Sequence, residues 1–236
     1  MLFYYIRHGD PIYDPDSLTE LGLKQADAVV SRLKLSKLDK IYASTSNRAI
    51  LTAEPTAKYY NKDIIKVDFA SEQHVWNNLT YNGSRGKCWL YQTPEIREVF
   101  HSKEIINLGF EWYKHPLFDN YIYKEEMDRI RKESDEFFLS LGYKHIGSGK
   151  YEVINDNNER IAMFAHQGFG LAFLSVIFDL PYPFVSTHFD MCHSGITVIE
   201  FKNENGYAYP KILTLSNDSH LFKEEILTKY NHEVDI

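Results

Sequence analysis

The residues best suited to chemistry end the first apolar run of the chain, where Arg7-His8-Gly9 follows residues 2–6. The planar guanidinium of arginine donates paired hydrogen bonds to an oxyanion, and an imidazole can attack or carry protons near neutral pH. Glycine lets the backbone approach a ligand closely. A strand over residues 2–6 would bring all three to the sheet edge where α/β folds bind ligands, which predicts a phosphate site with an imidazole nucleophile.

A second histidine and a second arginine occupy comparable positions. His166 follows the apolar run 161–165, and Arg48 opens the helix predicted after a strand over 40–43. The carboxyl ends of parallel strands lie at one edge of a sheet, so we expect His8 and His166 to face one crevice, with Arg48 directed to it. Together with Arg7, these side chains would form a cage for a phosphoryl group.

The order of the predicted elements sets the fold class. Strands over 2–6, 40–43 and 64–67 alternate with helices over about 21–33 and 48–60. This β-α-β-α-β order predicts an α/β fold with three α/β/α layers and a mainly parallel central sheet. The asparagine-rich segment 155–158 predicts a hairpin that joins a strand over 151–154 to one over 160–165.

The character of the chain changes between about residue 72 and residue 149. All three tryptophans fall in this stretch. A proline-initiated helix is predicted from Pro94, and a longer amphipathic helix over about 123–141. We expect residues 1–236 to form a single domain in which 72–149 is a helical cap insertion over the site.

Composition excludes several classes of partner. The net charge of −7 argues against nucleic acid, which requires a basic face. No apolar run is long enough to span a membrane, and two cysteines make no disulfide framework, so we expect a cytoplasmic protein. The spacing of His188, Cys192 and His193 matches no strong zinc pattern, and we expect no metal and no cofactor.

Four segments carry a family resemblance. They are residues 7–9, the Leu-Thr-x-x-Gly-x-x-Gln-Ala pattern at 18–26, the Ser-x-x-x-Arg-Ala-x-x-Thr-Ala pattern at 44–53, and the histidine-containing segment 164–168. In this order they resemble the histidine phosphatase superfamily, in its phosphoglycerate-mutase-like branch. The first quarter of the chain matches strongly and the last third moderately, whereas the middle has no matching motif.

The resemblance implies a mechanism for phosphomonoester hydrolysis. His8 would attack phosphorus and form a phosphohistidine, which water then hydrolyses. Arg7, Arg48 and His166 would bind the phosphoryl oxygens of a small phosphorylated substrate, with Gly9 beside them.

The reaction also needs a carboxylic acid that protonates the leaving alkoxide. Glu72 is the best candidate, since it follows the third predicted strand, where the family places its glutamate. Asp10 and Asp14 lie nearer to His8 in sequence and are its rivals. The acid-phosphatase branch carries an aspartate directly after its second histidine, but this chain has Gln167 there.

Three alternatives stay open at this point. A phosphoglycerate-type mutase would share the cage, although Pro11 and Asp14 depart from the mutase opening. A phosphoester-binding domain without turnover would keep the cage and lack the acid. A metal hydrolase built on the ten histidines would lose its activity to a chelator.

Overall fold

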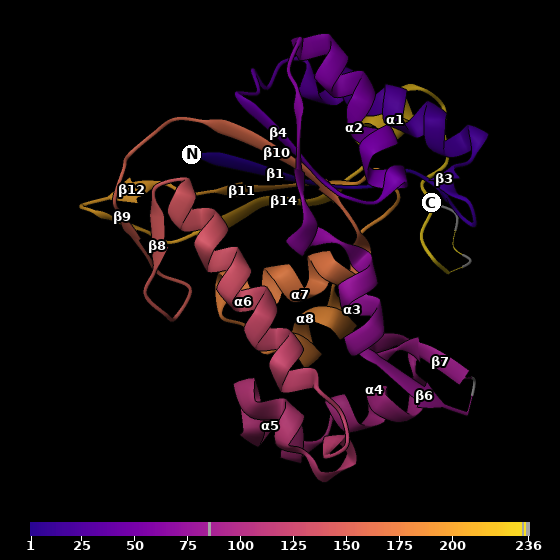
Figure 1. Cartoon of the computed structure of the whole chain (residues 1–236), viewed down its shortest axis with the longest axis vertical. Helices are drawn as coiled ribbons and strands as arrows, with labels where there is room; N and C mark the ends of the chain where they lie inside the picture. Colours follow the sequence, from indigo (N-terminus) through magenta and orange to yellow (C-terminus); the bar gives the residue numbers. More distant parts are fainter. Residues whose placement is uncertain (85, 233, 235–236) are drawn as a thin grey trace.

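A six-stranded sheet forms the centre of the computed structural model, which describes residues 1–84, 86–232 and 234 (Figure 1). Four neighbouring strands run parallel to one another, and β11 pairs antiparallel with both of its neighbours. This mixed but mostly parallel sheet confirms the predicted fold class. The order across the sheet is β14 (Lys211–Asn217), β11 (Ile196–Glu200), β1 (Leu2–Arg7), β10 (Arg160–Ala165), β4 (Lys40–Ser44) and β5 (Ile64–Val67).

Helices cover both faces of the sheet and complete three layers (Figure 1). One face carries α1 and α2, with α9 packed beside α1. The other carries α6 and α7, with α3 and α8 packed against α7. The bounds are α1 (Glu20–Leu33), α2 (Asn47–Tyr60), α3 (Glu72–Asn78), α6 (Tyr123–Ser140), α7 (Gln167–Phe178), α8 (Tyr182–His188) and α9 (Ser219–Lys223).

Alternation along β1 explains why the core has two parts. Tyr4 and Ile6 belong to the apolar cluster that contains Val29 of α1, whereas Phe3 and Tyr5 belong to the cluster on the other face. Successive side chains of a strand point to opposite faces, so a strand buried on both faces is apolar throughout. The two continuous apolar runs that end in His8 and His166 are therefore central strands.

The segment 72–149 contains the predicted helices and also a hairpin. Its further elements are β6 (Thr80–Gly83), β7 (Gly86–Trp89), η2 (Leu90–Gln92), α4 (Pro94–Phe100), α5 (Lys103–Leu108), η3 (Gly109–Lys114) and η4 (Pro116–Phe118). Trp112 anchors an aromatic cluster there, stacking on Tyr123 with ring centroids 5.6 Å apart. The far end of α6 lies on the central sheet instead, where Phe138 contacts Phe3 at 5.4 Å.

The hairpin predicted between 151–154 and 160–165 is wrong. Strand β9 (Tyr151–Val153) pairs with β8 (Tyr143–His145) and β13 (Tyr207–Ala208), which extends to β12 (Asn203–Glu204). Strand β10 enters the main sheet between β1 and β4. The asparagine-rich turn is a local signal, whereas burial of the apolar β10 on both faces decides the pairing. Among the described residues, no helix combines the length and apolar character needed to cross a bilayer.

Candidate active site

A cavity of about 780 Å³ opens where β1, β10 and β4 end. Its lining includes Arg7 at the end of β1, His8 directly after β1, Arg48 after β4 and Gln167 after β10. The parallel register pairs Arg7 with Ala165. This register places His8 beside His166, with ring centroids 5.1 Å apart.

His8 is held as a neutral imidazole. Its Nδ1 lies 2.7 Å from the carbonyl oxygen of Gly9, which only accepts, so Nδ1 carries the proton and Nε2 keeps its lone pair. Its backbone is fixed on both sides, by Ala165 at 2.9 Å and Ser194 at 3.0 Å. Burial, and then the charges of His166 and the arginines, hold the pKa of His8 well below its usual range. The ring therefore offers a lone pair at Nε2 even in mild acid.

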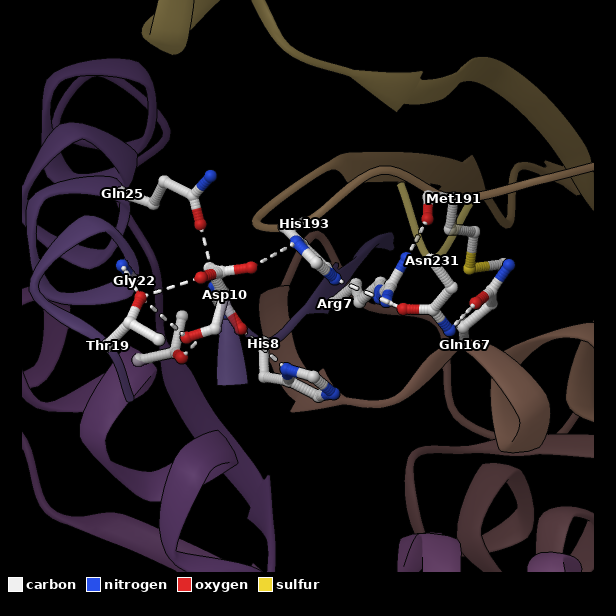
Figure 2. Close-up of polar contacts among 12 residues, drawn as sticks. Arg7, His8, Asp10, Thr19, Gly22, Gln25, Gln167, Met191, His193 and Asn231 are labelled. Carbon is white, nitrogen blue, oxygen red and sulfur yellow. Dashed lines mark hydrogen bonds and ion pairs between the residues drawn. The ribbon is translucent and has the colours of Figure 1, made fainter. Parts of the chain in front are cut away.

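Arg7 is a buried cation without a carboxylate partner. Its two terminal nitrogens donate to the Met191 carbonyl oxygen and to Asn231 Oδ1 (Figure 2). Within the described part of the chain, its Nε has no hydrogen-bond partner and no carboxylate forms an ion pair with it. An uncompensated guanidinium at the wall of a cavity is suited to an anionic ligand.

Arg48 stands in the first turn of α2. It pairs with Asp16 of the short β2–β3 hairpin (Pro11–Tyr13, Asp16–Leu18), with Nη1 and Oδ1 2.7 Å apart. Its guanidinium lies over the Tyr13 ring, 5.4 Å from the centroid. Asp16 is a site residue that sequence analysis missed, because its role depends on the hairpin turning back toward α2.

His166 lies fully buried at the start of α7. Its Nε2 is 2.8 Å from Ser44 Oγ at the end of β4, and its Nδ1 has no partner among the described residues. Burial and the nearby Arg48 and Arg7 hold the pKa of His166 well below its usual range. Ser44 Oγ also accepts from the Ser46 amide at 3.3 Å; in the tautomer in which the Ser44 hydroxyl donates to Nε2, Nδ1 carries the proton of the ring and is a donor.

Glu72 opens α3 and reaches the amino end of α7. Its two carboxylate oxygens accept from the backbone amides of Gly168 at 3.1 Å and Phe169 at 2.9 Å. Burial raises the pKa of Glu72, although these two hydrogen bonds oppose the shift. A carboxyl with a raised pKa in a cavity that also contains two arginines has a property that general acids share.

The two rival carboxylates differ in position. Asp10 lines the cavity, accepts from Thr19 Oγ1 at 2.7 Å and lies 3.2 Å from His193 Nδ1. Asp14 is exposed and is not part of the cavity lining. Asp10 is thus tied to the start of α1, where Thr19 also caps the helix by accepting from Gly22.

Gly9 has no side chain, which allows its backbone to pack closely against α1. A Cβ added there would lie 2.6 Å from the carbonyl oxygen of Gly22. The Gly9 amide donates to Thr52 Oγ1 at 3.0 Å, which ties the loop after His8 to α2. The close approach expected from the sequence is thus made to the backbone of α1.

A polar chain that sequence analysis missed runs behind His8 (Figure 2). His193 stacks on His8 with centroids 6.1 Å apart, and its Nε2 lies 3.2 Å from Asn231 Oδ1. Asn231 Nδ2 donates in turn to Gln167 Oε1 at 2.6 Å. Asn231 belongs to the C-terminal tail, whose Lys229 carbonyl accepts from the His193 amide at 2.8 Å. No periodicity or motif marks this tail as part of the site.

The three residues weighed as metal ligands contact different partners. The His188 ring meets His101 at 5.3 Å, the Cys192 amide donates to Ser216, and His193 belongs to the polar chain. The described residues contain no cluster of three or more potential metal ligands.

Comparisons with known proteins agree with this geometry. Residues 3–91 match the model of the histidine phosphatase superfamily (branch 1). No curated protein matches the chain. Among solved structures, a mutant of phosphoserine phosphatase from Entamoeba histolytica in complex with phosphoserine is 18% identical, with a TM-score of 0.61, and the match covers 93% of this chain and 98% of that one.

A mycobacterial glucosyl-3-phosphoglycerate phosphatase in complex with VO3 is 15% identical, also with a TM-score of 0.61, and the match covers 92% of this chain and 99% of that one. At these identities the structures show a shared fold, and the family model supplies the relationship in sequence. Over residues 3–91 the chain matches this superfamily in sequence, and the matched segment contains Arg7, His8, Arg48 and Glu72.

Proposed function

We propose that this chain is a phosphomonoester hydrolase that forms a phosphohistidine on His8. The observation that carries the proposal is the hydrogen bond from Nδ1 to the Gly9 carbonyl, which leaves the Nε2 lone pair in a cavity shared with Arg7 and Arg48. The superfamily and its phosphatase neighbours support phosphoester hydrolysis.

The first step transfers the phosphoryl group to the enzyme. His8 Nε2 forms a bond to phosphorus as the bond between phosphorus and the ester oxygen breaks, and protonated Glu72 gives its proton to the departing alkoxide. Arg7 and Arg48 hold the equatorial oxygens, and His166 Nδ1–H donates to one of them. Arg7 gives up its hydrogen bond to Asn231 Oδ1 and donates to a phosphoryl oxygen instead. The phosphoryl oxygen carries formal charge, whereas the amide oxygen does not.

The second step releases phosphate. Glu72, now a carboxylate, takes a proton from the water that attacks phosphorus, and the bond from phosphorus to His8 Nε2 breaks. Both forms of Glu72 are needed in turn, which fits a carboxyl whose pKa is raised above its usual value by burial. No step requires a metal ion, so we propose a metal-independent enzyme.

The insertion 72–149 is proposed to act as the cap. It supplies Glu72, Gln73, Trp76, Trp89 and Gln92 to the cavity lining. Neighbouring structures were solved with phosphoserine and with 3-phosphoglyceric acid. For this chain we propose, at this level, a small phosphorylated substrate.

Hydrolysis of p-nitrophenyl phosphate tests the proposal. We expect the wild type to release phosphate, with no loss on adding EDTA, and His8→Ala to lower kcat by at least about 10³-fold. His188→Ala, at an exposed histidine outside the cavity lining, is the control and should keep full activity. Activity that survives in His8→Ala would rule out His8 as the nucleophile.

A further inference from the structure

Apart from Glu72, the residues that the cap insertion adds to the cavity lining are uncharged, and two of them are aromatic. They are Gln73 and Trp76 on α3, Trp89 at the end of β7, and Gln92 at the end of η2. We call these four residues the outer wall. They come from the cap insertion, so they are placed to contact the part of the substrate that leaves with the ester oxygen.

Charge in the cavity is unfavourable to a second anion. Of the described lining residues, only Arg7 and Arg48 are cationic, both belong to the phosphate cage, and Arg48 is already shared with Asp16. The same lining contains three carboxylates, Asp10, Asp16 and Glu72. A carboxylate or second phosphate on the leaving group would be removed from water next to like charges and without a counter-ion.

Lys87 is a cation close to the outer wall. Its Nζ lies over the Trp76 ring, 5.3 Å from the centroid, and the residue is not part of the cavity lining. This contact holds the ammonium against the indole. Lys87 is therefore the cation to remove in a variant that tests whether a second anion finds a counter-ion beside the outer wall.

The two tryptophans form an angled aromatic surface. Their centroids are 4.9 Å apart and their planes meet at 74°. Trp89 is fixed, because its ring stacks on Tyr91 at 5.9 Å and packs so closely on Gly168 that a Cβ there would lie 2.6 Å from it. Trp76 is only partly buried and offers an accessible face.

This surface stands next to the proposed acid. The Gly168 amide donates to Glu72 Oε1, so the Trp89 ring that covers Gly168 borders the group that protonates the leaving oxygen. A ring joined to that oxygen would meet the indoles directly. Indole faces bind the apolar faces of aromatic and sugar rings, and the side-chain amides can pair with hydroxyl groups.

We propose that the preferred substrates are phosphomonoesters of uncharged, ring-bearing alcohols, and that the outer wall selects against leaving groups with a carboxylate or a second phosphate. This assignment rests on the proposed function. It differs from the proposal of a small phosphorylated substrate by naming what the leaving group must and must not carry.

Two matched pairs of compounds test the assignment through kcat/KM. Phenyl phosphate is compared with 4-carboxyphenyl phosphate, and glycerol 3-phosphate with 3-phosphoglycerate, so each pair differs by one carboxylate. We expect the uncharged member to be favoured by at least roughly tenfold in both pairs. Phenyl phosphate should bind His8→Ala more tightly than glycerol 3-phosphate, because only the former carries a ring.

Variants of the outer wall separate its two roles. Trp76→Ala should lower kcat/KM for phenyl phosphate by roughly tenfold, mainly through KM, and change glycerol 3-phosphate less than about twofold. Gln92→Arg should raise kcat/KM for the two compounds with a carboxylate and not for their uncharged counterparts. Lys87→Gln should leave both pairs unchanged, and a selective loss of 3-phosphoglycerate turnover in this variant would overturn the assignment.

Calorimetric binding to His8→Ala separates this assignment from the proposed function. If the wild type hydrolyses none of the four compounds, the proposed function fails, and the affinities of the two pairs still decide the assignment. Tighter binding of the uncharged member supports it. Equal or tighter binding of the carboxylate member overturns it, as would equal or higher kcat/KM for that member in the wild type.

Discussion

Two buried histidine sites in this chain have opposite electrostatics. His8 and His166 stand beside two arginines, and their pKa values lie well below the usual range. His145, at the end of β8, lies between Asp135 and Asp179 at 2.9 Å each. Burial alone would lower its pKa, but the hydrogen bonds to the two carboxylates raise it to about 9.

The two sites also differ in how fully their polar atoms are paired. Both ring nitrogens of His145 are hydrogen-bonded, and Asp179 pairs as well with Arg131 and the Gly149 amide. Beside the cavity, Nε of each arginine and Nδ1 of His166 have no partner among the described residues. Most buried donors in folded proteins are paired, so these open donors are available to a ligand, whereas the ring nitrogens of His145 are fully used within the fold.

Among the substitutions in this comparison, Glu72→Gln, in the site with His8 and His166, should have the largest effect on activity. We expect kcat for an alkyl phosphate to fall by about 10³-fold, because the amide cannot protonate the leaving alkoxide. The loss should be smaller for p-nitrophenyl phosphate, whose leaving group needs little protonation. Equal losses for the two substrates would show that Glu72 does not act as the acid.

His166→Gln should lower kcat/KM by about 10²-fold, since it removes a donor to the phosphoryl group. Stability should change little, because the glutamine amide can replace Nε2 as the partner of Ser44 and the Nδ1 that is lost has no partner among the described residues. Rates and urea unfolding are measured on the same preparation, with His188→Ala as the reference. A stability loss that accounts for the lost activity would assign His166 to the fold.

The pH dependence of hydrolysis follows from the two opposite shifts. His8 must be neutral, and its lowered pKa keeps it so in mild acid, whereas Glu72 must be protonated, which requires a pH below its raised pKa. The value of kcat/KM, which reports the first step, should therefore be highest in acid and fall about tenfold per pH unit above the pKa of Glu72. Profiles of kcat/KM for the wild type and Glu72→Gln check this, since the alkaline decline should be absent from the variant.

His145→Gln should change stability and leave activity intact. A histidine whose pKa is raised on folding stabilises fully below its unfolded value of 6.5, and this contribution is lost as pH rises through about 9. We expect a loss of about 3 kcal/mol in the free energy of unfolding near pH 6, which disappears above about pH 9. Urea titrations across this range measure it, and a loss independent of pH would contradict the ion-pair account.

The central sheet was predictable because its strands are apolar and end in polar residues. Buried strands such as β1 and β10 can be recognised in the sequence as continuous apolar runs, and the parallel arrangement then brings His8 and His166 to one edge of the sheet. The pairing of β9 was not predictable, because a turn signal says which residues bend and not which strand lies beside them. The strand that lies beside β9 is decided by which strands can be buried on both faces of the central sheet.

The cage was predictable in outline, and its supports were not. Arg7, His8, Arg48 and His166 sit at strand and helix ends that sequence patterns reveal. Asp16 and His193 reach the site from loops, and the tail residue Asn231 lies more than 200 positions from the arginine it contacts (|i−j| = 224). Contacts of this kind depend on loop and tail paths that leave no periodic signal.

Trapping the covalent intermediate tests the central claim most directly. The protein is mixed with a phosphomonoester, quenched in alkali, and examined for phosphate attached to a peptide containing residue 8. Phosphohistidine is stable in alkali and labile in acid, and we predict it on His8 of the wild type and of His145→Gln, with none in His8→Ala. Steady hydrolysis without any phosphorylated His8, or with the phosphate on another residue, would contradict the account.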